Sequence, residues 1–596
     1  MIEFKKIKIR KEFAILFIIL IVISAILPSF ANFNTVETKK VFVYSHYNSD
    51  VLNVSYNKDY IQRLNEYNDE FIKNNKSSIY RIDTTPGHGN TASYFLSIKY
   101  NQANEKNVNS SGILSNYKTG LEKIDGVYEA TISNFDTFHY NYSLSVIYKV
   151  LGIIIFFLTL ILLINKIGLK NNLTLALICV LSTAGVMFNF LFILTALNIS
   201  VLMLLHIIRK NEKDAKYIIG IFSLALVLRL LGTAVMLIYN NYSFNSLFAY
   251  VQPDEINYYN TAIRISNFFI SGTMPDILQI VGFKQFGYNI FLAFVNMING
   301  ELFFVSKIIN ILVSGFISVL TYVFVKELLD EKAAKLSGFI VCLMPTMIMF
   351  SAYTLRDIII VILIMIILYL SMRKEKLTAR VVLILLASVI SLWFLRNYTV
   401  LIIGMVVILY KVLGYTRKKH VNPIIIIGVM IAGSFAFFQV TSKVYNFNTF
   451  NAIYNYFKYT GFIPFLQEFV LSLVNLDFLV NSTATSYGKS TIIRMFYPDT
   501  LFLILSFPFF IIGIIKGYKI NKNLTISLLT LFPVFIILYK IYYDGWFLRT
   551  QIQVLPIQVA FISLGIIDVF GARYDKLLLW IGKRFSRLPA GESEEI

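Results

Sequence analysis

Runs of about 20 consecutive apolar residues recur along most of this chain, and that is the length a helix needs to cross the hydrocarbon core of a bilayer. The composition agrees, because 57% of the 596 residues are hydrophobic and only 15% are charged. A water-soluble fold cannot bury so many such runs. The sequence therefore predicts an all-α integral membrane protein with about thirteen or fourteen transmembrane helices and excludes a soluble multidomain protein.

The apolar runs divide the chain into segments. The 1–32 segment carries basic residues, then an apolar run that ends in Ser29-Phe30-Ala31, so it is either a membrane anchor or a cleaved signal peptide. Additional transmembrane helices are expected in 145–215 and a larger transmembrane domain over 216–570. The individual spans after the first are expected at 145–165, 172–189, 191–208, 216–239, 302–325, 333–351, 357–372, 379–395, 398–414, 423–441, 499–516, 524–541 and 547–568.

The positive charge reports orientation. The chain has a formal net charge of +20, and Lys and Arg gather in short segments between predicted spans. Because cytoplasmic loops retain such residues, both termini and the 571–596 tail are predicted to be cytoplasmic in a multi-pass protein of the cell membrane. The same pattern places 33–144 and the long loops 240–301 and 442–498 outside. It also disfavours a nucleic-acid partner.

The 33–144 segment has a different composition from the spans, with 11 Lys and Arg against 12 Asp and Glu. Runs of β-branched and aromatic residues at 41–44, 94–100 and 127–133 predict strands, and the periodicity of 59–74 predicts an amphipathic helix. We therefore expect a small α+β extracytoplasmic domain.

Two adjacent carboxylates, Asp254 and Glu255, begin the 240–301 loop after Pro253. A carboxylate near a low-dielectric surface can have a raised pKa, which suits a general base. The alternative is a solvated helix N-terminus, where acidic residues are favourable without any chemistry. The aromatic residues of this loop could stack on a sugar; the candidates are Tyr258, Tyr259 and Tyr288.

Three arginines lie at predicted external turns: Arg356, beside Asp357, then Arg396 and Arg549. Arginine stays charged and binds phosphate through two hydrogen bonds, so the three suit the phosphate of a lipid headgroup or a pyrophosphate. The alternative is snorkelling, or ordinary contact with membrane headgroups. A short apolar stretch in the 442–498 loop, from 466 to 480, is expected to lie on the membrane surface.

From 216 to 570 the sequence resembles the polytopic glycosyltransferases with the C-type fold, in particular the protein O-mannosyltransferases and the aminoarabinose transferase of lipid A. Degenerate motifs occur in the order typical of that family. They are Leu228-Arg229-Leu230, Pro253-Asp254-Glu255 with Tyr259 and Ala262, Phe286-Gly287-Tyr288-Asn289, Gly300, Lys307 with Asn310, Gly315 and Tyr322, Pro345 with Ser351 and Asp357, and Arg549 with Pro556. The chain departs from the pattern at Lys307, which is often Arg, and at Gln551 and Gln553, where a second Pro is expected.

The resemblance implies an enzyme that moves a sugar from a polyprenyl-phosphate-linked donor to an envelope glycan, lipid or protein at the outer face. Asp254 would be the general base, and Glu255 and Asp357 would orient the acceptor or hold a divalent cation. Arg356, Arg396 and Arg549 would bind the donor phosphate. The sequence offers no His cluster that would settle the use of a metal.

Two other functions stay open: a flippase or transporter of lipid-linked saccharides, and a polysaccharide polymerase or ligase. Transporters place charged residues and broken helices near the middle of the membrane. In this sequence most spans are uncharged at their centres, with Arg229 as an exception, and the acidic residues gather at one predicted surface. A polymerase or ligase would share the long outer loops but has no need of Asp254-Glu255.

Overall fold

A computed structural model describes the chain in seventeen stretches. They are 37–46, 58–79, 81–86, 92–101, 112–125, 130–133, 137–140, 142–167, 191–244, 253–271, 286–299, 303–373, 378–419, 458, 461–473, 497–543 and 548–585. The predicted spans at 172–189 and 423–441 and the apolar run of 1–32 lie outside these residues.

Contacts between residues divide the chain into two compact units, which are described separately below. Unit 1 comprises Met1–Ile219, Leu226–Leu312 and Ser351–Arg356, and unit 2 comprises Gly220–Ala225, Val313–Phe350 and Asp357–Ile596. The chain passes from one unit to the other within helices α8 (Ala215–Phe244) and α12 (Phe303–Leu328).

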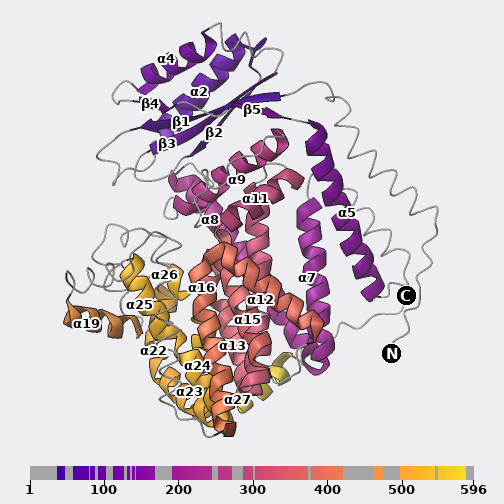
Figure 1. The fold of residues 1–596 in the computed structure, drawn as a ribbon, viewed down its shortest axis with the longest axis vertical. Helices are drawn as coiled ribbons and strands as arrows, with labels where there is room; N and C mark the ends of the chain where they lie inside the picture. Colours follow the sequence, from indigo (N-terminus) through magenta and orange to yellow (C-terminus); the bar gives the residue numbers. More distant parts are fainter. Residues whose placement is uncertain are drawn as a thin grey trace. The chain divides into compact units, whose positions relative to one another are not determined.

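Unit 1 contains an antiparallel sheet of five strands. The strands are β1 (Glu37–His46), β2 (Arg81–Pro86), β3 (Ala92–Asn101), β4 (Ala130–Ser133) and β5 (Thr137–Tyr140). They lie in the order β2-β3-β1-β4, and β5 pairs with the other end of β1. Helices α2 (Lys58–Asn74) and α4 (Ile113–Asp125) cover one face of the sheet, as Figure 1 shows.

Aromatic and polar contacts join α2 to α4. The rings of Tyr67 and Tyr117 stack with centroids 5.5 Å apart. The Tyr67 hydroxyl donates to the carbonyl of Tyr117 over 3.0 Å, and the Tyr117 hydroxyl donates to Asn68 Oδ1 over 2.7 Å. Burial, and secondarily the charge of Glu70, raises the pKa of Tyr67 to about 12, so its hydroxyl stays a donor at neutral pH. A side chain at Gly120 would overlap the Tyr67 ring, which explains a glycine there.

The expectation of a separate 33–144 domain is not supported. The sheet belongs to the same compact unit as helices α5 (Tyr142–Ile167), α7 (Leu191–Lys210), α9 (Pro253–Ser271) and α11 (Phe286–Asn299). Strand β5 contacts α9, and only Asn141 separates β5 from α5. The short link prevents the sheet from moving as an independent body, and composition alone did not indicate this.

Several helices can cross a membrane. Within the described ranges, five helices are long and apolar enough to span, or up to seven if each of two bent helix pairs forms one span. The five are Leu144–Leu162, Phe192–Lys210, Glu212–Asn240, Phe304–Leu328 and Ala379–Tyr415. The chain is therefore a membrane-embedded, multi-pass protein. The count of thirteen or fourteen spans and the sidedness of the loops stay predictions.

The longest of these helices, α16 (Ala379–Lys419), is interrupted once. Arg396 has φ −161° and ψ 85°, an extended conformation inside an otherwise helical segment. A straight helix of 41 residues would be about 60 Å long, roughly twice the thickness of the hydrocarbon core. The break lies where the sequence predicts a turn between two spans.

Unit 2 is a bundle of helices. Besides α16 and the C-terminal part of α12, its helices are α13 (Glu331–Leu343), α14 (Pro345–Ala352, which ends in unit 1), α15 (Asp357–Met372), α19 (Phe462–Leu473), α22 (Tyr497–Leu505), α23 (Phe507–Ile520), α24 (Lys522–Leu529), α25 (Leu531–Tyr543), α26 (Leu548–Gln551) and α27 (Leu555–Phe585). Nearly every residue of α15 is buried, so this helix lies in the centre of the bundle. Helix α27 continues beyond residue 570, into the predicted tail.

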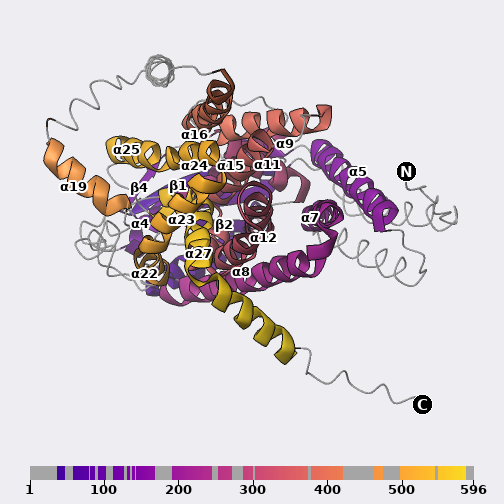
Figure 2. The ribbon, with the colours of Figure 1, turned by 90° about the horizontal axis from the view of Figure 1, so that it is seen from below.

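The closest crossing in unit 2 joins α23 to α27, which lie side by side in Figure 1 and Figure 2. A Cβ atom on Gly513 would overlap the carbonyl oxygen of Phe561, and one on Gly565 would overlap that of Phe509. Small residues allow such an approach, and membrane helices without a strong hydrophobic driving force depend on it.

We expect Gly513→Ala to destabilise unit 2, because the added methyl group must push α23 and α27 apart. Overpacking of this kind costs about 1–3 kcal/mol. The matched control is Gly404→Ala on α16, where no atom lies within 4 Å of an added Cβ. Thermal unfolding in detergent should give a lower midpoint for Gly513→Ala and an unchanged or higher one for Gly404→Ala; equal midpoints would contradict the close crossing.

Candidate functional site

The first polar cluster lies in unit 1, at the start of α9. Pro253 begins this helix, where its missing N–H costs nothing, and Asp254 and Glu255 follow in the first turn, where negative charge is favourable. The Glu255 side chain is fully buried and forms an ion pair with Lys307 of α12. Lys307 Nζ also donates to the carbonyl of Ala352 over 2.7 Å.

The 352–355 segment, which connects α14 to α15, is held by α12 at each residue. Asn310 Nδ2 donates to the carbonyls of Tyr353 and Leu355, over 2.7 and 3.0 Å. The Ser306 and Thr354 hydroxyls lie 2.9 Å apart, and the Thr354 N–H donates to Glu255 Oε1 over 2.8 Å. Non-helical backbone buried in a membrane protein needs such partners, since water cannot satisfy it.

Glu255 and Asp254 have different environments although they are adjacent. The carboxylate of Glu255 is engaged by Lys307 and by the backbone of Thr354, so in this structure it ties α9 to α12 and to the 352–355 segment. The side chain of Asp254 is partly exposed. Of the two predicted acids, Asp254 is the one that a substrate could reach.

An aromatic group lies one helical turn beyond Asp254. The guanidinium carbon of Arg356 lies 5.8 Å from the ring centroid of Tyr258, within the range of a cation–π interaction. The rings of Tyr258 and Tyr288 meet edge to face with centroids 5.0 Å apart. Both tyrosines and Tyr259 are buried. Because residues four apart share a helix face, Asp254, Tyr258 and the Arg356 guanidinium belong to one side of α9.

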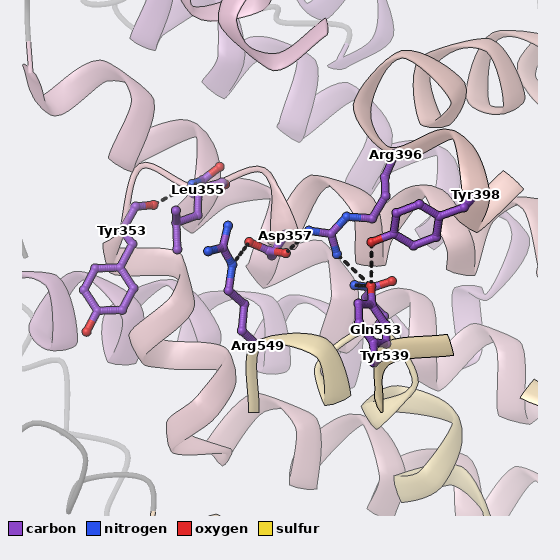
Figure 3. Close-up of polar contacts among 9 residues, drawn as sticks. Tyr353, Leu355, Asp357, Arg396, Tyr398, Tyr539, Arg549 and Gln553 are labelled. Atoms are coloured by element: carbon purple, nitrogen blue, oxygen red, sulfur yellow. Dashed lines mark hydrogen bonds and ion pairs between the residues drawn. The ribbon is translucent and has the colours of Figure 1, made fainter. Parts of the chain in front are cut away.

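The second cluster, called the Asp357 cluster, lies in unit 2 (Figure 3). Asp357 is the first residue of α15 and is fully buried. Its Oδ1 accepts from Arg396 Nη2 over 3.1 Å, and its Oδ2 accepts from Arg549 Nε over 2.8 Å. One carboxylate therefore holds arginines from two distant parts of the sequence.

Tyr539 of α25 completes the Asp357 cluster. Its hydroxyl accepts from Arg396 Nη1 over 3.0 Å and from Gln553 Nε2 over 2.8 Å, and it lies 3.1 Å from the Tyr398 hydroxyl. Figure 3 shows this tyrosine on the side of Arg396 away from Asp357. The Arg396 side chain is 7% exposed and that of Arg549 23%, so Arg549 is the more accessible of the two arginines.

The structure brings the predicted residues together in two groups. Asp254, Glu255, Tyr258, Tyr288 and Arg356 belong to unit 1. Asp357, Arg396 and Arg549 belong to unit 2 and contact one another. The arrangement of the two groups as one catalytic site stays a prediction.

Some residues of these clusters had no role in the prediction from individual residues. Lys307 and Asn310 entered only through the family resemblance, although a charged residue one turn from an amide inside an apolar run is itself a signal of a buried polar site. Ser306, Thr354 and Tyr539 gave no signal, because hydroxyl-bearing residues are common in transmembrane helices. Gln553 was noted only as a departure from the family pattern.

Within the described residues, no group of three or more His, Cys, Asp and Glu side chains is placed to hold a metal ion. No known protein-family model and no curated protein matches this sequence.

We expect Glu255→Ala to destabilise unit 1 strongly, because it leaves the Lys307 ammonium buried without its carboxylate. Breaking a buried pair in this way costs about 3–5 kcal/mol. The double variant Glu255→Ala with Lys307→Met should recover much of that loss, whereas Glu331→Ala, at an exposed position on α13, should change little. Thermal unfolding in detergent measures all three. An additive loss in the double variant would mean that the two side chains do not interact.

Arg396→Lys should cost more stability than Arg549→Lys. Arg396 donates through two nitrogens to two acceptors, Asp357 and Tyr539, and a lysine cannot reach both in that geometry. A buried acceptor left unsatisfied costs roughly 1–3 kcal/mol. Arg549 has one such contact and is more exposed, so lysine can replace it more easily. Equal unfolding midpoints for the two variants would contradict this order.

Proposed function

We propose that this protein is a membrane glycosyltransferase with the C-type fold, which moves a sugar from a polyprenyl-phosphate-linked donor to an envelope glycan, lipid or protein. The observation that carries the proposal is the difference between the two acids of α9. Glu255 is buried and bound, so it can fix the first turn of the helix, and Asp254 is left partly exposed in that rigid turn. A general base needs this combination of accessibility and fixed position.

Asp254 would accept the proton of an acceptor hydroxyl as its oxygen attacks the anomeric carbon of the donor sugar. The bond from that carbon to the phosphate oxygen would break, and its electron pair would leave with the polyprenyl phosphate. Attack from the opposite face inverts the configuration of the carbon. Tyr258, Tyr259 and Tyr288 would shape the region for the sugar or acceptor, although their burial favours a supporting role over direct contact.

Arginine is the side chain best suited to the charge that develops on the leaving phosphate. Arg549 is the favoured candidate, since it is the more exposed arginine of the Asp357 cluster and is held there through Nε. Asp357 and Arg396, both buried, would fix its position, and Arg356 would act beside Tyr258. A divalent cation, if one is used, would be an addition to these groups.

This function requires the 33–144 segment and the loops 240–301 and 442–498 to be extracytoplasmic, with both termini in the cytoplasm. The distribution of Lys and Arg supports that topology. The sheet of unit 1 would then lie outside the cell, and its contact with α9 offers a way for an acceptor bound there to approach Asp254.

A flippase or transporter of lipid-linked saccharides is the second candidate, and one observation favours it. Two helix pairs in unit 2 are bent, α13 with α14 by 48° and α22 with α23 by 55°, and broken helices are common in transporters. The buried carboxylate of Asp499 on α22 accepts from the Thr346 N–H at the start of α14. This end of α14 is thus occupied by the protein's own carboxylate, which favours a structural purpose for the break.

We expect Asp254→Asn to abolish sugar transfer, because asparagine cannot accept the acceptor proton. Loss of a general base lowers the rate by roughly a hundredfold or more. In a deletion strain complemented with the variant, mass spectrometry should show that the envelope loses the sugar and that the polyprenyl-phosphate-linked donor accumulates. The control is Asp568→Asn, which alters an exposed carboxylate on α27 and should restore the sugar fully.

Two outcomes would contradict the enzyme. Normal glycosylation by Asp254→Asn, at wild-type abundance in the membrane, would exclude Asp254 as the base. Failure to transport would give a different pattern from failure to transfer, because the donor would then accumulate on the cytoplasmic face, where membrane-impermeant reagents cannot reach it.

A further inference from the structure

Helix α19 (Phe462–Leu473) is the helix of unit 2 whose surface is hardest to explain by packing within the protein. Four large apolar side chains are exposed on it, Phe462 (65%), Ile463 (69%), Leu466 (49%) and Val470 (50%). At 100° per residue these positions fall within one stripe about 100° wide. An uncovered stripe of this kind marks a surface for a partner.

The opposite side of α19 is attached to the bundle. Phe465 and Ser472 are buried, and α19 contacts α25. Glu468 lies on this attached side, about 200° from Leu466 around the helix. The helix is therefore amphipathic in its packing: one side is held by the protein, and the apolar stripe faces away.

The length and direction of α19 decide between partners. Twelve residues span about 18 Å, well short of the hydrocarbon core, so α19 cannot cross the bilayer alone. In Figure 1 it lies across the direction followed by α13 and α15 of the same unit, and in Figure 2 it is seen along its length instead of end-on. A helix perpendicular to the spans of its own bundle lies parallel to the membrane plane.

The stripe also continues a surface that already faces lipid. Helix α25, which holds α19, exposes Ile537, and α22 exposes Leu501 and Leu505. The stripe itself contains no charged residue. An apolar stripe in the membrane plane, continuous with lipid-facing helices, fits the boundary between headgroups and acyl chains better than it fits a protein partner.

We infer that α19 is an in-plane helix that inserts Phe462, Ile463, Leu466 and Val470 into one leaflet at the level of the headgroup–acyl boundary, and thereby fixes the depth of α25. Because Tyr539 of α25 binds Arg396, this anchor also sets the depth of the Asp357 cluster relative to the lipid headgroups. The predicted surface segment 466–480 is refined accordingly: the described helix begins at 462 and ends at 473. The inference does not depend on glycosyl transfer.

The test is a depth measurement on the full chain in liposomes of phosphatidylcholine. In a background with Cys179→Ser and Cys342→Ala, single cysteines at Leu466 and at Val470 carry an environment-sensitive fluorophore. Lipids with a nitroxide near the headgroup, or near the end of the acyl chain, quench it according to depth. Leu386→Cys, at an exposed position within the predicted span 379–395, calibrates the deep position.

The shallow nitroxide should quench the labels at 466 and 470 about twice as strongly as the deep nitroxide does, because an interfacial helix inserts only 5–10 Å or so. The control Glu468→Cys, on the attached side, should be quenched less than either. Stronger quenching by the deep nitroxide would place α19 inside the hydrocarbon core and overturn the inference. Absence of quenching by both would overturn it as well, because protein or water would then cover the stripe.

These outcomes are independent of the proposed enzyme. A label at 466 that is quenched as expected, in a protein whose Asp254→Asn variant still glycosylates the envelope, would leave the anchor established and remove the enzyme. The reverse pair of results would remove the anchor alone.

Discussion

The buried ion pair between Glu255 and Lys307 is the interaction on which the candidate site of unit 1 depends. Each charge would be costly alone in this environment, so each requires the other, and the two fix α9 against α12. Lys307 and Glu255 also bind the backbone of Ala352 and Thr354. The pair therefore has two effects: it neutralises buried charge, and it allows a non-helical segment to exist away from water.

This dependence explains how two adjacent acids come to have separate tasks. A helix turns by 100° per residue, so consecutive side chains point in different directions. Glu255 points into the protein, where its partners are, and Asp254 points to a side from which solvent or substrate can approach. Chemistry by Asp254 would rely on Glu255 for its position, and the same reasoning assigns Asp357 to the positioning of Arg396 and Arg549.

The sequence predicted those parts of the fold that follow from local patterns. Apolar runs located α5, α7, α8 and α12, and β-branched runs located β1 and β3, because each pattern reflects one element and one environment. The break of α16 at Arg396 was predicted from a single polar turn. The attachment of the sheet to α9 was missed, because it depends on a contact between segments more than a hundred residues apart.

The candidate site followed the same division. Charged residues beside or within spans are rare enough to be noticed one at a time, which is why Asp254, Asp357 and the arginines were identified. Their partners were not, since Thr354 contributes through its backbone and Tyr539 resembles the many other tyrosines of this chain. A polar residue that serves a buried charge differs from an ordinary one only by its neighbours in space. What the structure adds is therefore the division between acids that are held and the acid that is accessible, and this division makes Asp254 the position where the proposed chemistry is most sharply tested.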